Sequence, residues 1–173
     1  IPIFPFINKF DRVGADFFNA IQTMKDRLGA NAVAAQLPMG AEDQFWGVID
    51  LVTMTAWDFK ADDKGMTYPE KMDAIPDEFA DIAQKKHDEL VEAAADCYDD
   101  VAMKFLDNEE ITVDELKAAI RKGTLAEEFV GVFCGSAHAN KGIQPLLDAV
   151  ERYLPNPTEV HNYGLDLDKN EEQ

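Results

Sequence analysis

Residues 3–11 read IFPFINKFD, an apolar run that turns directly into a polar loop. The apolar part, residues 3–7, predicts a buried strand, although Pro2 and Pro5 cannot donate hydrogen bonds to a neighbouring strand. After the loop, apolar side chains recur at spacings of four, three and four, which predicts a helix over residues 16–28. Strand, loop and helix in this order are typical of an α/β domain with a parallel sheet.

The same order of elements returns near the other end of the chain. Residues 129–134 read FVGVFC and are apolar throughout, as expected for a parallel strand that is covered on both faces. The loop Gly-Ser-Ala at residues 135–137 follows, and then a helix with an apolar stripe over residues 143–154. Pro145 is compatible with the first turn of that helix.

The stretch between these two units has a different pattern. Residues 33–37 predict a strand, residues 45–51 and 53–59 predict a strand pair, and residues 62–65 predict a hairpin turn. The sequence therefore predicts an α/β fold with a partial parallel sheet and an inserted α+β subdomain.

Helices follow the strands of the middle stretch. One long helix is predicted over residues 77–106, after Pro76. Thr112 and Glu115 have the Thr-x-x-Glu spacing of a capping box, so a short helix is expected to begin there and to end before Gly123.

The 173-residue chain is strongly acidic: 34 Asp and Glu against 16 Lys and Arg give a formal net charge of −18. This charge repels a polyanion and excludes DNA or RNA binding by general charge attraction. No apolar run reaches about 18 residues, so no membrane partner is expected. Cys97 and Cys134 match no metal-ligand spacing and are expected to be free thiols in a cytoplasmic protein.

The polar loop after the first strand has a chemistry that suits guanine. The Asp11 carboxylate can accept hydrogen bonds from the adjacent N1–H and 2-amino groups of guanine, whereas adenine would leave a buried carboxylate unpaired. The Lys9 stem can lie along the base, and Asn8 can brace the loop and meet the base edge. In isolation, an ordinary Asn/Asp surface turn with a solvated lysine explains these residues equally well.

A second loop strengthens the guanine hypothesis. Ser136 and Ala137 follow an apolar strand and precede a helix, so small side chains there let backbone N–H groups approach a carbonyl such as guanine O6. Ligands of open α/β sheets bind beyond the carboxyl ends of the strands. The alternative is a helix-entry turn with Ser136 as a cap. His138 at the helix start is expected to be solvated or capping rather than a nucleotide contact, and His87 is expected to be exposed.

Four stretches of the chain resemble elongation factor G, the family of ribosomal translocation GTPases. They are NKFDRVGADF at residues 8–17, RLGANAVAAQLPMGAEDQFWGVIDLV at 27–52, AAIRKGT at 118–124 and CGSAHANKGIQPLLDAVERYLPNP at 134–157. The resemblance implies that Asn8, Lys9, Asp11, Ser136 and Ala137 contact the guanine of GTP or GDP.

The resemblance also implies a domain organisation. Residues 1–28 and 125–160 would be the C-terminal part of the GTPase domain, residues 29–124 the insert of elongation factor G, and residues 161–173 a tail leading towards the next domain. The chain has no Gly-x-x-x-x-Gly-Lys-[Ser/Thr] string to hold phosphates. It is therefore expected to be a fragment that lacks the N-terminal half, holds no Mg²⁺ ligand and hydrolyses no GTP by itself.

The acidic helix of the insert is a candidate docking surface. In the family the insert is implicated in contact with the C-terminal domain of the ribosomal stalk protein, while tRNA and mRNA would be reached only through the parent protein on the ribosome. The candidate residues, chosen by helix position, are Asp88, Glu89, Glu92, Asp96 and Asp99. Two alternatives stay open: a solvated face of an acidic interaction module that binds no nucleotide, and a related GTPase of the ribosomal-protection or release-factor type.

Overall fold

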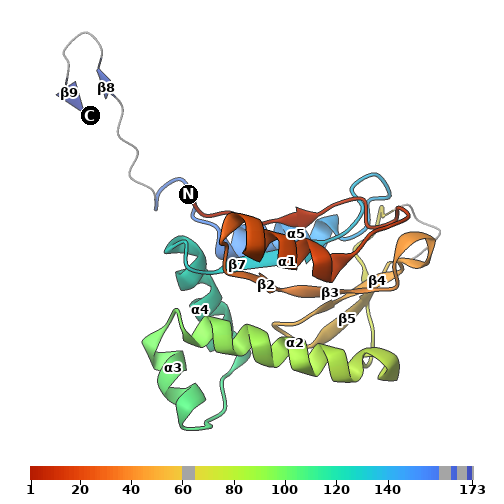
Figure 1. The fold of residues 1–173 in the computed structure, drawn as a ribbon, viewed down its shortest axis with the longest axis horizontal. Helices are drawn as coiled ribbons and strands as arrows, with labels where there is room; N and C mark the ends of the chain where they lie inside the picture. The colour runs from red at the N-terminus through yellow and green to blue at the C-terminus, as the bar shows by residue number, and fades with distance from the viewer. Residues whose placement is uncertain (60–64, 160–164, 167–170, 173) are drawn as a thin grey trace.

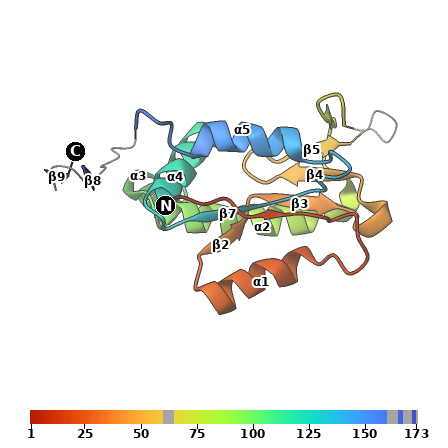
Figure 2. The same cartoon turned by 90° about the horizontal axis from the view of Figure 1, so that it is seen from above.

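A three-stranded parallel sheet forms the centre of the computed structural model, which describes residues 1–59, 65–159, 165–166 and 171–172. Its strands are β1 (Phe6–Ile7), β7 (Val130–Cys134) and β2 (Ala32–Ala34), in the order β1-β7-β2. Helix α1 (Phe17–Leu28) covers one face and α5 (Ile143–Tyr153) covers the other (Figure 2). The sheet and these two helices confirm the predicted α/β fold.

Local signals set the ends of α1. The Asp16 side chain accepts a hydrogen bond from the Asn19 backbone nitrogen at 2.9 Å and caps the first turn. Gly29 ends the helix in the left-handed conformation, with φ of 62°, which a residue without Cβ adopts at little cost. The predicted helix at residues 16–28 is confirmed.

The predicted strand at residues 33–37 is confirmed only in part: residues 33–34 and 36–37 are in strands, but the chain changes sheets at Ala35. The Ala35 nitrogen donates to the Val132 carbonyl of β7, and its carbonyl accepts from Leu51. One residue thus bonds both sheets, with β2 before it and β3 (Gln36–Met39) after it. β2, which the sequence places in the insert, lies in the parallel sheet.

An antiparallel sheet in the order β3-β4-β5-β6 follows (Figure 1). β4 (Gly47–Asp50) and β5 (Thr55–Asp58) confirm the predicted strand pair, and the 3-10 turn η1 (Glu42–Gln44) precedes them. β6 (Glu70–Lys71) is the edge. The predicted hairpin turn at 62–65 falls, except for Gly65, outside the described residues.

The single long helix predicted over residues 77–106 is wrong. The structure has α2 (Asp77–Ala95) and α3 (Asp99–Leu106), separated by Tyr98 in an extended conformation with φ of −148°. Acidic residues fill the first turn of α3, where the helix dipole favours them, and the Tyr98 carbonyl accepts from Val101 and Ala102. A new helix start is therefore favoured, and α3 folds back beside α2 and α4 (Figure 1).

Helix α4 (Val113–Leu125) confirms the capping box but continues past Gly123. The Thr112 nitrogen donates to the Glu115 carboxylate at 2.9 Å. A Cβ at Gly123 would lie 2.8 Å from the Cys97 Sγ and 2.8 Å from the Phe129 Cβ. The expected helix end at this glycine is therefore wrong: the residue lets α4 pack closely on its neighbours.

Several smaller expectations are also tested. His87 is half-buried rather than exposed, because its Nδ1 lies 2.7 Å from the Leu51 carbonyl oxygen. Cys97 and Cys134 are free, and burial raises the pKa of the Cys134 thiol. Beyond α5, β8 (Leu165–Asp166) pairs with β9 (Glu171–Glu172). Among the described helices, none has the length and apolar character needed to cross a bilayer.

Candidate functional site

Two loops lie together at the carboxyl ends of neighbouring parallel strands. β1 pairs with β7 so that Ile7 lies opposite Cys134. The pairing continues into the loops, since Gly135 donates to the Ile7 carbonyl at 3.0 Å and Phe10 donates to the Gly135 carbonyl at 3.1 Å. The loop after β1 and the loop after β7 are therefore held by backbone hydrogen bonds.

Asn8 joins the two loops through its side chain. Its Oδ1 accepts from the Ala137 backbone nitrogen at 3.0 Å and from the Lys9 backbone nitrogen at 2.7 Å. One amide oxygen thus fixes both turns, which leaves the exposed Lys9 in a left-handed conformation with φ of 60°. Such a conformation is uncommon for lysine and marks a constrained turn.

Asp11 and Ser136 meet from opposite loops. Hydrogen bonding from the Ser136 side chain lowers the pKa of the Asp11 carboxyl, and the nearby Arg12 and His138 charges act in the same direction. Ser136 itself is fully buried, and its Oγ accepts from the Ala139 nitrogen at 3.2 Å. The site therefore holds an ionised, half-exposed carboxylate beside a rigid serine, which suits a ligand with adjacent N–H donors.

Two further residues hold this geometry, and sequence reasoning missed them. Phe10, between Lys9 and Asp11, is buried and packs its ring 5.2 Å from that of Phe45. Lys141 forms a backbone bridge with Ser136 and sends its Nζ to the Phe45 carbonyl at 2.5 Å. The aromatic residue inside a polar loop was the available signal for Phe10, and no local signal distinguishes Lys141 from a surface lysine.

Gly135 is required by the close approach of the loop after β7. A Cβ there would lie 2.4 Å from the Lys141 carbonyl oxygen and 2.7 Å from the Phe6 ring. Ala137 and His138, which follow in the same turn, are exposed. Within the described ranges, no three His, Cys, Asp or Glu side chains are grouped as metal ligands.

The candidate docking residues lie on an exposed, acidic surface. Four of them lie along α2 and its C-cap, and Asp99 lies separately in the first turn of α3. Glu89, Glu92 and Asp96 border a groove between α1 and α2, and Glu89 pairs with Lys86 at 2.6 Å. All five are exposed: Asp88, Glu89, Glu92, Asp96 and Asp99.

Comparisons with known proteins identify chains of similar sequence or fold. A family model described as "Elongation factor Tu GTP binding domain" matches residues 1–156. A crystal structure of a protein from Thermus thermophilus has a TM-score of 0.78 with 23% sequence identity over 92% of this chain, so the two share a fold. The match spans 23% of that Thermus chain, so the present chain corresponds to less than a quarter of its length.

Proposed function

Because this chain belongs to the elongation factor Tu GTP-binding domain family, we propose that it supplies guanine recognition to an elongation factor G type GTPase. The observation that carries the proposal is the bridge from the Asn8 side chain to the Ala137 backbone, which unites the two loops. The proposed parent uses GTP hydrolysis to move tRNA and mRNA on the ribosome.

Each site residue has a proposed role at the base. The Asp11 carboxylate accepts from guanine N1–H and the 2-amino group, and its lowered pKa supports the ionised form that this requires. The proposal assigns the turn at Ser136 and Ala137 to the O6 side of guanine and the Lys9 stem to the face of the ring. Asn8 fixes the loops and meets the base edge.

We assign phosphate chemistry to other segments of the parent protein. In this class a P-loop holds the phosphates and helps to place Mg²⁺, and none of the ten glycines here starts such a string. In this proposal residues 1–28 and 125–160 belong to the GTPase domain and residues 29–124 to an insert whose first strand, β2, extends the parallel sheet. Residues 161–173 lead towards the next domain.

The proposed second role is docking of a basic partner surface, which the resemblance assigns to the C-terminal domain of a ribosomal stalk protein. The acidic face of α2 and the start of α3 support it, because opposite charges raise the rate of association. Salt should weaken the contact. The residues assigned to this surface are Asp88, Glu89, Glu92, Asp96 and Asp99.

Nucleotide binding tests the guanine proposal. We expect a fluorescent GDP analogue to bind the chain and to be displaced by GDP but not by ADP. Asp11→Asn should lose GDP and gain xanthosine diphosphate, since xanthine carries a carbonyl where guanine carries the 2-amino group and an amide can donate to it. Asp26→Asn, on the exposed side of α1, is the control and should keep GDP binding. Equal displacement of the analogue by GDP and by ADP would overturn the proposal.

A charge-reversal pair tests the docking proposal. Glu89→Lys combined with Glu92→Lys should slow association with the purified stalk domain. Glu109→Lys combined with Glu110→Lys changes the net charge equally at exposed positions between α3 and α4, and should have a smaller effect. If both pairs slow association equally, net charge alone explains the effect, and the proposal of a defined docking surface on α2 is refuted.

A further inference from the structure

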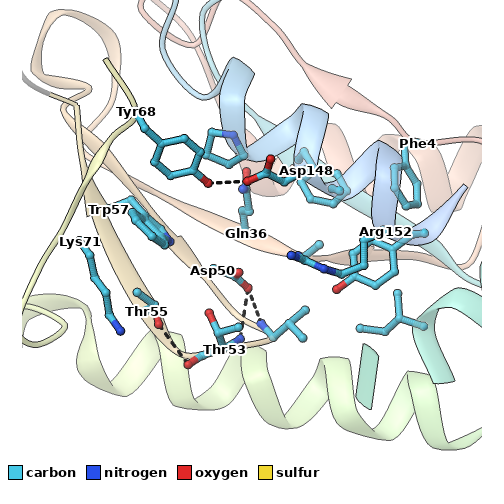
Figure 3. Close-up of a pocket in the computed structure, with 18 residues that line it drawn as sticks. Phe4, Gln36, Asp50, Thr53, Thr55, Trp57, Tyr68, Lys71, Asp148 and Arg152 are labelled. Carbon is cyan, nitrogen blue, oxygen red and sulfur yellow. Dashed lines mark hydrogen bonds between the residues drawn. The ribbon is translucent and has the colours of Figure 1, made fainter. Parts of the chain in front are cut away.

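A cavity of about 270 Å³ lies between α5 and the antiparallel sheet (Figure 3). None of the five candidate base-contacting residues lines it. Its volume falls just below the roughly 300–1,000 Å³ of common ligand sites, which points to a ligand smaller than a nucleotide. The cavity is therefore a second space, independent of the guanine proposal.

The sheet register places a row of polar side chains on the wall of this cavity. Gln36 of β3 lies opposite Asp50 of β4, which lies opposite Thr55 of β5. Directly opposed residues of antiparallel strands project from the same face, here the face towards α5. Figure 3 shows these three side chains around one space.

Gln36 carries an unsatisfied acceptor in this wall. The residue is 3% exposed, and its Oε1 has no hydrogen-bond partner among the described residues. Buried polar atoms are nearly always paired, and an unpaired one calls for a ligand or another specific cause. Gln36 also lines the cavity, so a donor N–H or O–H that reaches Oε1 from this side would complete its hydrogen bonding.

Charged groups of both signs surround the same space. Asp50 uses Oδ1 to accept from the Val52 and Thr53 nitrogens at 2.8 and 3.2 Å, and hydrogen bonds to its Oδ2 from described residues are absent. Arg152 of α5 lines the cavity, is exposed, and has its guanidinium 5.8 Å from the centroid of the Tyr153 ring. The cavity thus offers an anionic acceptor opposite a cationic donor.

Aromatic rings form the apolar part of the lining. Trp57 packs against Tyr68 with ring centroids 5.4 Å apart, and the Tyr68 hydroxyl donates to Asp148 at 2.6 Å. Phe133 and Tyr153 add further ring surface. A ligand that fits these surfaces has an apolar body of modest size.

We propose that this cavity binds a zwitterionic α-amino acid with an apolar side chain. The ammonium group donates to Gln36 Oε1 and Asp50, and the carboxylate accepts from Arg152. The side chain packs against Trp57 and Tyr68. A ligand of this class pairs with Gln36, Asp50 and Arg152 at once, whereas a simple cation or a simple anion pairs with only one of the two charged groups.

Fluorescence titration tests the site. The chain has two tryptophans, so Trp46→Phe leaves Trp57 in the cavity as the single reporter. The probes are L-phenylalanine, phenethylamine and 3-phenylpropionate, which share the ring but carry both charges, the positive charge alone or the negative charge alone. We expect saturable binding of L-phenylalanine and at least tenfold weaker binding of the other two.

Variants in the same background locate the binding. Gln36→Leu and Arg152→Met should each weaken L-phenylalanine binding at least tenfold, while Arg27→Met on the exposed side of α1 should leave it unchanged. If a variant fails to fold, two-dimensional NMR of the unsubstituted chain provides a second measurement. Addition of L-phenylalanine should then shift the signals of the Gln36 and Arg152 amides. No saturable change at millimolar probe, or equal binding of the three probes, overturns the proposal and leaves the guanine proposal intact.

Discussion

The side-chain oxygen of Asn8 accepts a hydrogen bond from the backbone nitrogen of Ala137 at 3.0 Å, across 129 residues of sequence. The same oxygen accepts from the Lys9 nitrogen at 2.7 Å. Since β1 and β7 end side by side, this one atom fixes the relative position of two loops that begin on different strands. A ligand between the loops would meet a preformed surface, which reduces the entropy cost of binding.

Removal of this bridge should loosen both loops. We expect Asn8→Ala to lower the free energy of unfolding by about 0.5–1.5 kcal/mol, the usual net value of a hydrogen bond. The effect should stay within this range because both loops are partly exposed. Urea denaturation measures the change. Asn8→Asp keeps an acceptor oxygen and should lose less stability; equal losses for the two variants would contradict a bridging role.

A methyl group at Gly123 should destabilise the protein. On an open helix surface Gly→Ala stabilises by about 1 kcal/mol. Here the added Cβ would lie 2.8 Å from the Cys97 Sγ and 2.8 Å from the Phe129 Cβ, and overpacking costs about 1–3 kcal/mol. Gly123→Ala should therefore lower the urea midpoint. In a Cys97→Ala background, where the sulfur is gone, the loss should shrink; a rise in stability in the native background would refute the close packing.

The capping box of α4 should make stability depend on pH in the acid range. The hydrogen bond from Lys104, followed by those from Thr112, lowers the pKa of Glu115 from 4.5 to about 2. Because the folded pKa is the lower one, the stabilisation is complete above about pH 4.5 and is lost as the pH falls towards 2.

Thermal unfolding between pH 2 and pH 6 measures this contribution. Glu115→Gln should reduce the fall in melting temperature below about pH 4.5 (the acid limb of the profile), since an amide cannot titrate. Glu151→Gln, an exposed position on α5 without an ion pair to the described residues, is the matched control and should keep the limb. An unchanged acid limb in Glu115→Gln would assign the pH dependence to other carboxylates.

Arg121 should restrain residues 154–159, which follow α5. Its guanidinium donates to the Arg152 and Leu154 carbonyls at 2.9 Å and forms two hydrogen bonds with the Glu159 carboxylate. We expect Arg121→Met to cost about 1.5–3 kcal/mol, as for hydrogen bonds to charged groups. Hydrogen exchange of the Asn156, Thr158 and Glu159 amides should accelerate.

A lysine at residue 121 separates charge from geometry. Arg121→Lys keeps the charge but loses the planar fork, so it should restore only part of the protection. Lys117→Met removes a cation whose nearest carboxylate, Asp114, lies 3.8 Å away at the surface. That variant should change stability little. Full rescue by lysine would show that charge alone matters.

The chain by itself should release no phosphate from GTP. Phosphoryl transfer depends on groups that position the phosphates and neutralise their charge, and the sequence has no P-loop string. A phosphate-release assay with GTP and with ATP tests this expectation. Guanine-specific turnover by the isolated chain, abolished in Asp11→Asn, would disprove it.

Local sequence signals predicted several elements well. Apolar spacing over residues 16–28 predicted α1, and Thr112 and Glu115 marked the start of α4. These signals work because capping groups bond residues only a few positions away. The apolar run of β7 was equally clear, since a strand buried on both faces needs apolar residues throughout.

Other features required contacts between distant residues. The passage of α4 through Gly123 depends on close packing against Cys97 and Phe129, and Cys97 lies 26 residues earlier in the chain. The change of sheet at Ala35 depends on hydrogen bonds to Val132 and Leu51. Periodicity cannot report such contacts, because it describes only one element at a time.

The sequence by itself determined the α/β order of elements, the polar residues that follow the two parallel strands, and the acidic balance of the chain. Only the tertiary structure decided that Asn8 bonds Ala137, that Ser136 meets Asp11, and that Gln36 has a buried acceptor without a partner among the described residues. The physical reason is the sequence separation over which each interaction acts: helix caps and apolar periodicity depend on residues only a few positions apart. The sites, by contrast, arise where strands far apart in the chain become neighbours.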